Sequence, residues 1–370
     1  MSYMGPTLLV DIGSASVGAC IAENAEGNIV VSHVKRVSLV NVSGQNTAGI
    51  TALALDALKK CLAGFERVSP AARSAHAVLA APWYSARLKT ISIAPERPVR
   101  MDKGTVEKAL HDYQEQHVED LLAGTRRMES SVSQAYVNGY PTALLEPVMG
   151  KDLTLNVYES EADAVFLAGI EEAIRAAFAG VQTTFHSFPY AAFAVFRAYR
   201  DEQSFIIVDV GGEITDIAIV NRDGLFFLGS FPLGTLTLLR SIAGQGSIAD
   251  AASRLSLYAR SELSAEEEAT FGALFVKARQ AWSGEYRKLL ENAVLEAPVP
   301  NTTFLIADKE ELKWFERVLT EAESPFPIRP IIVTPDFFQS VVSLGQEGSY
   351  ESFLSIAALN ALAIKTESYG

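Results

Sequence analysis

Cysteine, histidine and basic residues are all scarce in this chain, and each scarcity excludes a class of protein. Only Cys20 and Cys61 are present, so the sequence has neither a disulfide framework nor a cysteine-based zinc site. The five histidines show no metal-ligand spacing. Lys and Arg number 31 against 44 Asp and Glu, which gives a net charge of -13. A negative field repels phosphate backbones, so we expect no nucleic-acid partner.

Long hydrophobic runs are also missing. No apolar run approaches the roughly 20 residues that span a bilayer, and no basic stretch precedes an apolar one at the N-terminus as in a signal peptide. Hydrophobic residues make up 49% of the 370 residues and charged residues 20%, which is typical of globular proteins. The composition therefore predicts a soluble, cytoplasmic protein without direct membrane insertion, and the length predicts about two domains.

An internal repeat organises the chain. Residues 8–29 read LLVDIGSASVGACIAENAEGNI, and residues 206–227 read IIVDVGGEITDIAIVNRDGLFF. An offset of 198 positions (209 minus 11) aligns Asp11 with Asp209 and Gly13 with Gly211. Each copy contains an apolar run, an Asp-x-Gly turn and a second strand-like run, so each predicts a hairpin that opens one half of the chain. A duplication at this distance predicts two similar lobes.

The residues that follow each apolar run suit a phosphate group. Glycine after a strand lets backbone N–H groups approach an anion closely, and hydroxyl groups add further donors. Carboxylates at the strand ends can hold Mg²⁺ through water, because that ion keeps much of its hydration shell. The candidate phosphate-binding residues are Gly13, Ser14, Ser16, Gly211, Gly212 and Thr215, and the candidate Mg²⁺ residues are Asp11 and Asp209.

These motifs resemble those of the actin-like ATPase superfamily, and within it the FtsA/PilM branch of cell-division and type IV pilus assembly proteins. VDIGSASVGACIAE resembles the first phosphate motif. VDVGGEITDIAIVNRDGLFFLGSFPLG resembles the second, which adds Gly234 to the candidate site. The resemblance implies an α/β fold with two actin-like (duplicated ribonuclease H-like) lobes and a small inserted α+β domain in the first lobe. It also implies ATP and Mg²⁺ as candidate cofactors.

The same resemblance implies the domain boundaries. The first lobe takes residues 1–88 and 162–203, the inserted small (SHS2-like) domain takes 89–161, and the second lobe takes 204–370 with a helical subdomain at about 246–300.

Local signals add detail to this division. Ser264 followed by Glu267 is a capping-box pattern, which predicts the start of a helix. The apolar segment 350–365 predicts a last helix that packs in the core. We interpret Arg126 and Arg127 as surface residues and Glu213 as a solvated turn residue.

The sequence departs from the family pattern at positions that bear on ATP. The lysine that usually follows the first phosphate loop is missing at Ser16 and Gly18. Ser253 and Ser256 stand where the ribose-side helix usually carries charged residues, and residues 307–310 replace a Gly-rich turn. Two alternatives stay open. ATP–Mg²⁺ binds through the two hairpins with slow or absent hydrolysis, or the pocket is vestigial and the fold serves as a scaffold. No catalytic residue is identified.

The resemblance implies two cellular roles, and the superfold offers a third. A PilM-type scaffold of type IV pilus assembly binds the cytoplasmic tail of a bitopic, PilN-like inner-membrane protein in a groove beside the small domain. An FtsA-like protein acts with division or cytoskeletal filaments, and a small-molecule kinase is the distant alternative. The last helix lacks the basic face of a membrane-surface helix, which favours the PilM-type role. We therefore expect a protein peripheral to the inner membrane through its partner, with self-association as a further option.

Overall fold

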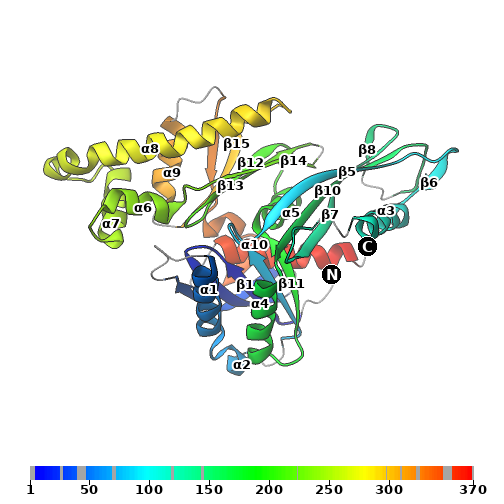
Figure 1. Ribbon diagram of the computed structural model, residues 1–370, viewed down its shortest axis with the longest axis horizontal. Helices are drawn as coiled ribbons and strands as arrows, with labels where there is room; N and C mark the ends of the chain where they lie inside the picture. Colours follow the sequence, from blue (N-terminus) through cyan, green and yellow to red (C-terminus); the bar gives the residue numbers. More distant parts are fainter. Residues whose placement is uncertain are drawn as a thin grey trace.

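The computed structural model of the protein consists of two lobes and a small domain beside them (Figure 1). The described residues are 5–25, 28–39, 47–68, 72–117, 121–142, 146–222, 224–296, 298–308, 311–321, 326–344 and 352–368.

The first lobe is built on a six-stranded sheet in the order β11-β4-β1-β2-β3-β17. β1 pairs antiparallel with β2 and parallel with β4, which in turn pairs parallel with β11. The strands are β1 (Thr7–Ile12), β2 (Ser16–Ala25), β3 (Asn28–Ser38), β4 (Ser74–Leu79), β11 (Gln182–Ser187) and β17 (Val342–Leu344). Every residue of β1 is buried because helices cover both faces of the sheet, which explains its almost unbroken apolar sequence.

The second lobe repeats this arrangement with the sheet order β14-β13-β12-β15-β16. Its strands are β12 (Phe205–Val210), β13 (Thr215–Asn221), β14 (Gly224–Phe231), β15 (Thr302–Ile306) and β16 (Arg329–Ile332). β12 has an antiparallel neighbour on one side and a parallel one on the other, as β1 has. Asp11 pairs with Gly18 and Asp209 with Asp216, so the two hairpins also share their register. The predicted duplication is confirmed.

Helices form layers outside and between the two sheets (Figure 1). α1 (Thr47–Leu62) and α4 (Ala164–Ala177) pack on the outer face of the first-lobe sheet, and the short α2 (Phe65–Val68) follows α1. α6 (Thr235–Ala243), α7 (Ile248–Ala259), α8 (Ala265–Val294) and α9 (Leu312–Glu321) cover the outer face of the second-lobe sheet. The capping box of Ser264 and Glu267 starts α8, as predicted.

Two further helices lie between the sheets and join the lobes into one core. They are α5 (Phe188–Tyr199) and α10 (Ser352–Ser368). Phe196 of α5 stacks on Phe304 of the second-lobe sheet with ring centroids 4.4 Å apart. The same cluster contains Leu9 and Cys20 of the first-lobe sheet. Burial of this shared apolar surface stabilises the two lobes together.

The small domain has a four-stranded antiparallel sheet in the order β5-β10-β7-β8. Its elements are β5 (Ser85–Ile93), β6 (Val99–Met101), α3 (Lys103–Gln116), β7 (Thr125–Val137), β8 (Tyr140–Thr142), β9 (Val148–Gly150) and β10 (Leu153–Asp163). Asp102 caps α3 and forms a capping box with Thr105, which fixes where this helix begins. The domain follows β4 of the first lobe and leads into α4, so it is an insertion in that lobe.

The end of the chain differs from our expectation that 204–370 belongs to the second lobe. β17 pairs parallel with β3, so the chain returns to the first-lobe sheet after the 3₁₀ helix η2 (Pro335–Phe338). The free edge of β3 provides the backbone partners that a strand this short needs. A three-residue strand carries too little pattern to be predicted from the sequence.

The last helix packs in the core, as predicted. Ile356, Ala358 and Leu359 of α10 have no exposed surface, and they lie in the cluster between the two sheets. Positions 350 and 351 of the predicted helix lie outside the described residues. Within the described ranges, no helix combines the length and the apolar character that are needed to cross a membrane.

Candidate functional site

The two predicted phosphate loops adopt the same backbone turn. The amide of Gly13 donates to the carbonyl of Ser16 over 3.0 Å, and the amide of Gly211 donates to the carbonyl of Ile214 over 3.0 Å. These bonds close the β1–β2 and β12–β13 hairpins at positions that the 198-residue offset relates. The Asp-x-Gly motifs therefore make matching turns at corresponding places in the two lobes.

The two loops touch each other in this arrangement. The Ser14 hydroxyl oxygen accepts a hydrogen bond from the Glu213 amide over 3.0 Å, and Ser14 is buried. A Cβ added at Gly212 would lie 2.7 Å from the Cβ of Ala15. Phosphate oxygens could enter only if the loops moved apart, which would break the Ser14–Glu213 bond.

Arg36 places a cation beside the first loop, although the sequence lacks the lysine expected at Ser16 or Gly18. Its guanidinium donates to the Asp11 carboxylate over 2.8 Å and to the Ser16 hydroxyl oxygen over 2.8 Å. Gly18 pairs with Arg36 across β2 and β3, and the Arg36 side chain lies where a side chain at position 18 would be. The missing Cβ of Gly18 thus lets a cation from β3 neutralise Asp11.

The start of α6 packs directly against the second loop through backbone hydrogen bonds. The amide of Thr235 donates to the carbonyl of Gly211 over 2.8 Å, and the amide of Leu236 donates to that of Gly212 over 2.7 Å. Helix N-terminal amides are the usual anion site of such a fold, and here backbone carbonyls satisfy two of them. A Cβ at Gly234 would collide with the carbonyl groups of Gly211 and Gly212, so Gly234 is required for this close packing.

Thr215 does not join the other candidate residues. Its hydroxyl group donates to the carbonyl of Leu233 over 2.7 Å and accepts from the indole of Trp282 over 3.1 Å. Thr215 is fully buried in the second lobe. Its side chain therefore holds α8 against the second-lobe sheet. Glu213 is not a solvated turn residue either, because its carboxylate forms an ion pair with Arg240 of α6.

Asp209 is a buried carboxyl group, and one of its oxygens, Oδ1, has no hydrogen-bond partner. Burial raises the pKa of Asp209 well above its usual value, and the nearby charges of Asp216, Asp11 and Asp308 raise it further. Asp11 already pairs with Arg36, and burial disfavours the charged form of Asp209, so neither carboxyl group is a strong ligand for Mg²⁺ in this arrangement. Among the described residues, no group of three or more His, Cys, Asp or Glu side chains is placed to hold a metal ion.

The segments expected beside adenosine make contacts within and between the helices of the second lobe. Ser253 of α7 donates its hydroxyl to the carbonyl of Ala249, one turn earlier. Arg254 lies over the ring of Phe271 in α8, with 4.4 Å between the guanidinium carbon and the ring centroid. The carbonyl of Asp308 accepts from the amides of Glu311 and Leu312 at the start of α9. Residues 309 and 310 lie outside the described residues.

Asp216 links the second lobe to the segment that enters the small domain. Its Oδ2 accepts a hydrogen bond from the Tyr84 hydroxyl over 2.6 Å. Burial raises the pKa of Asp216 to about 6, although the bond from Tyr84 lowers it. A carboxyl group with a raised folded-state pKa stabilises the protein most below its unfolded pKa, and that stability is lost as the pH rises through about 6.

We therefore expect Asp216→Asn to reduce the pH dependence of stability. Between pH values near 4 and near 7, the native chain should lose up to about 3 kcal/mol through this group, and the variant should not. Urea unfolding of both chains across this pH range measures the difference. Parallel pH profiles for the two chains would contradict the assignment.

A groove lies between the first lobe and the small domain. It has a volume of about 750 Å³ and is lined by α1, the start of α4, the end of β10 and the segment 82–85. Most of its lining is apolar, including Ile50, Leu55, Trp83 and Phe166. Val165 lines it with 79% of its surface exposed. Trp83 also donates its indole N–H to the carbonyl of Gly13 over 3.0 Å, so the groove adjoins the first loop.

Comparison with known proteins supports the fold. No protein-family model matches the sequence, and no curated protein matches it. A solved structure described as a PilM-PilN type IV pilus biogenesis complex matches 97% of this chain and 98% of its own, with a TM-score of 0.65 and 17% identity. The chain has an actin-like fold. The predicted resemblance to the PilM branch is therefore confirmed at the level of structure.

Two further solved structures resemble the chain more weakly. Ethanolamine utilization protein EutJ from Carboxydothermus hydrogenoformans matches with a TM-score of 0.42 and 13% identity, over 96% of this chain and 89% of its own. The cytoplasmic domain of EpsL, an inner membrane component of the type II secretion system of Vibrio cholerae, matches with a TM-score of 0.37 and 12% identity, over 97% and 95%.

Proposed function

We propose that this actin-like protein is a PilM-type scaffold of a membrane-associated assembly. It would bind a partner peptide in its groove, and its nucleotide site would be closed. Its partner would be the cytoplasmic tail of a bitopic, PilN-like inner-membrane protein. The observation that carries the proposal is the groove between α1, α4 and the small domain. Its volume of about 750 Å³ is in the range of pockets that bind ligands specifically.

The lining of the groove suits an extended peptide with apolar anchors. Trp83 and Phe166 form an aromatic wall with ring centroids 4.7 Å apart. Thr125 and Asp163 add polar groups beside this apolar lining. Apolar surface at the centre and polar groups around it are typical of protein interfaces, where a few buried anchors supply most of the affinity.

The state of the phosphate loops supports a scaffold more than an ATPase. The Ser14–Glu213 contact and the Asp11–Arg36 pair occupy the space and the charge that ATP–Mg²⁺ would need. The burial of α10 gives no support to an FtsA-like membrane helix at this position. The kinase alternative needs an open cleft between the lobes, which the touching loops do not provide. Self-association stays a prediction.

Val165→Glu is the variant that tests the groove. Val165 is largely exposed, so the change should leave folding intact while placing a third carboxylate near Glu161 and Asp163. We expect the affinity for a synthetic tail peptide of the PilN-type protein from the same genome to fall at least about tenfold. Isothermal titration calorimetry measures the dissociation constant.

Leu295→Glu is the matched control, because Leu295 follows α8 with 83% of its surface exposed and is not part of the groove lining. The control should bind the peptide as the native chain does. Equal binding by Val165→Glu would place the peptide elsewhere, and no binding by the native chain would overturn the proposed partner.

A further inference from the structure

A separate cavity lies where the two lobes and the small domain meet, and we call it the junction cavity. It has a volume of about 320 Å³. Its walls come from the segment between β4 and β5, the start of β5, Pro189 of α5, and strands β13 and β14 of the second lobe. Pro82, Tyr84 and Ser85 also line the groove, whereas the walls from α5 and the second lobe do not. A cavity of this volume is large enough for a small free molecule.

Asp216 is the charged residue of the junction cavity, and the other lining residues that the structure describes are uncharged. Only 7% of the surface of Asp216 is exposed. The remaining lining is mostly apolar, with hydroxyl groups at a few positions. Pro189, Ile217 and Leu228 contribute apolar surface, and Ser230 contributes a hydroxyl group.

The hydrogen bonds that Asp216 forms come from neutral donors. The Tyr84 hydroxyl donates to its Oδ2 over 2.6 Å, and the backbone amide of Ala81 donates as well. A carboxylate can accept about four hydrogen bonds, so about two positions remain. No basic side chain in the described part of the chain forms an ion pair with Asp216. Its carboxylate is therefore buried without a compensating positive charge.

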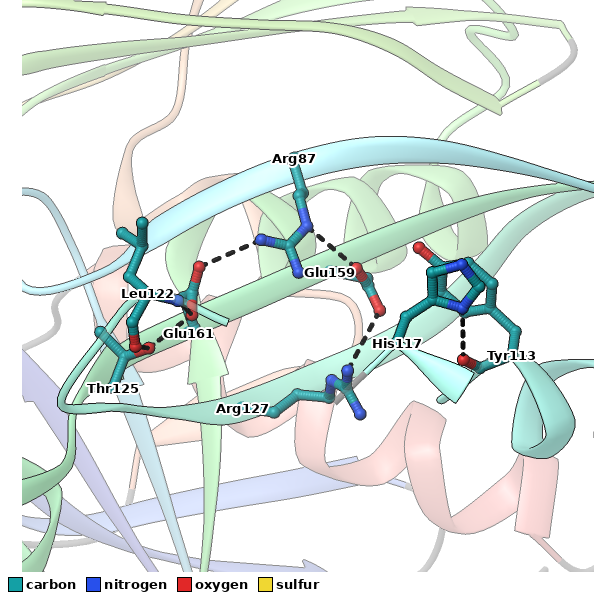
Figure 2. A network of polar contacts seen from close by, with 8 residues as sticks. All are labelled: Arg87, Tyr113, His117, Leu122, Thr125, Arg127, Glu159 and Glu161. Atoms are coloured by element: carbon teal, nitrogen blue, oxygen red, sulfur yellow. Dashed lines mark hydrogen bonds and ion pairs between the residues drawn. The ribbon is translucent and has the colours of Figure 1, made fainter. Parts of the chain in front are cut away.

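Two buried carboxylates on neighbouring β10 show the usual arrangement. Arg87 donates to Glu159 over 3.0 Å and to Glu161 over 3.1 Å, so one guanidinium serves both (Figure 2). Buried charges in proteins are normally paired in this way. Burial raises the pKa of Asp216 to about 6, so its charged form still predominates at neutral pH. A cation that enters the cavity would relieve this unfavourable burial.

The lining defines the kind of cation that fits. The described residues include no group of three or more His, Cys, Asp or Glu side chains placed to hold a metal ion, and the apolar walls favour an organic molecule. A guanidinium group bonds best to both oxygens of a carboxylate, but the Tyr84 hydroxyl already uses Oδ2. An ammonium group is compact and has three donors, which suit the remaining positions of Asp216 and the Ser230 hydroxyl.

We propose that the junction cavity binds a small primary amine in its ammonium form, with the Asp216 carboxylate as the acceptor. The short apolar chain of the amine lies against Pro189 and Leu228. Because the cavity has walls from both lobes and from the small domain, the bound amine holds these parts together. The proposal is independent of the partner segment in the groove.

Butylammonium is the probe for the junction cavity. In a methyl ¹H–¹³C spectrum of the full chain, we expect the δ1-methyl signal of Ile217, identified by its loss in Ile217→Val, to shift and saturate as butylammonium is added. Butanol has the same chain without the charge and should bind at least about tenfold more weakly.

Two results of this titration would overturn the proposal. Equal affinities for butylammonium and butanol would show that the carboxylate does not select a cation. A signal that stays unmoved up to about 100 mM butylammonium would show that there is no site, because even an inefficient ligand of this size should bind by then.

Asp216→Asn tests the acceptor. Asparagine keeps an oxygen that can accept from Tyr84, so the fold should persist, but the negative charge is lost. We expect the affinity for butylammonium to fall at least about tenfold. The matched control is Asp250→Asn, which makes the same charge change at an exposed position of α7 outside the cavity and should bind as the native chain does. Equal binding by the two variants would contradict the role of Asp216.

Ser230→Lys supplies a cation from within the chain. Ser230 is exposed and lies directly opposite Asp216 in the β13–β14 pairing, so a lysine there can place its ammonium on the carboxylate. The variant should no longer bind butylammonium, and its melting temperature should rise by about 2 °C. The rise should vanish in the double variant with Asp216→Asn. A lysine that raises the melting temperature equally with and without the carboxylate would overturn the proposed acceptor.

Discussion

Replacing Glu129 by alanine is expected to lower the free energy of unfolding by about 3–5 kcal/mol, because the change removes the acceptor of a buried network. Glu129 lies on β7 of the small domain and is nearly fully buried. One carboxylate oxygen accepts from the Ser187 amide over 2.9 Å, the Ser187 hydroxyl over 2.6 Å and the Ser160 hydroxyl over 3.0 Å. The other lies 3.1 Å from Nδ1 of His186.

This network joins the small domain to the first lobe. Ser187 and His186 belong to β11, and His186 in turn lies 2.9 Å from a ring nitrogen of His76 on β4. Without Glu129, the Ser187 amide and Nδ1 of His186 would stay buried and lose this partner. Unsatisfied buried groups of this kind carry their full desolvation cost.

Urea unfolding at neutral pH measures the loss, with two variants for comparison. Glu129→Gln keeps an acceptor oxygen and should lose clearly less stability than Glu129→Ala. Glu107→Ala on the exposed face of α3 should change stability by no more than about 0.5 kcal/mol. A loss below about 1 kcal/mol for Glu129→Ala would show that the network contributes little.

Magnesium ATP is expected to bind more weakly than about 1 mM, which corresponds to less than ~4 kcal/mol of binding free energy. Separating the loops would break the Ser14–Glu213 bond and the contact of Gly212 with Ala15. Freeing Asp11 for a metal would leave that buried carboxylate without the Arg36 guanidinium. The α6 amides of Thr235 and Leu236 would have to leave the carbonyls that they already bind. Each step subtracts from the affinity that phosphate contacts could supply.

The duplicated halves could be predicted from the sequence because their signal is local. An apolar run, an Asp-x-Gly turn and a second apolar run fix each hairpin within about a dozen residues. The capping box at Ser264 is predictable for the same reason, because it involves only residues three positions apart. The Ser264 side chain accepts from the Glu267 amide, and the Glu267 side chain accepts from the Ser264 amide. The structure places Ser14 beside Gly211 and Ala15 beside Gly212.

Arg36 could not be predicted, because its position depends on strand register. The β2–β3 pairing shifts register between Ala19 and Ile21, and only the shifted pairing sets Arg36 against Gly18. A one-residue error would place the arginine on the other face of the sheet. The sequence therefore shows that the expected lysine is missing, but it does not show that Arg36 lies beside the loop instead.

The position of Arg127 could not be predicted from the sequence either. Arg126 and Arg127 have the same local signal, which predicts a surface position for both. Successive residues in a strand point to opposite faces, and only packing against β10 decides which one is covered. Arg126 reaches Glu171 with 42% of its side chain exposed, whereas 21% of the Arg127 side chain is exposed beside Glu159. The partners of both arginines are more than 30 residues away in the chain, beyond any local pattern.

Calorimetric titration of magnesium ATP into the native chain tests the central claim, a scaffold with a closed nucleotide site, most directly. The touching loops and the Asp11–Arg36 pair predict no measurable heat of binding at ATP concentrations up to about 1 mM. The double variant Asp11→Ala with Asp209→Ala should give the same trace as the native chain. A micromolar dissociation constant for the native chain that the double variant abolishes would contradict the claim, because ATP would then hold the loops apart through those two carboxylates.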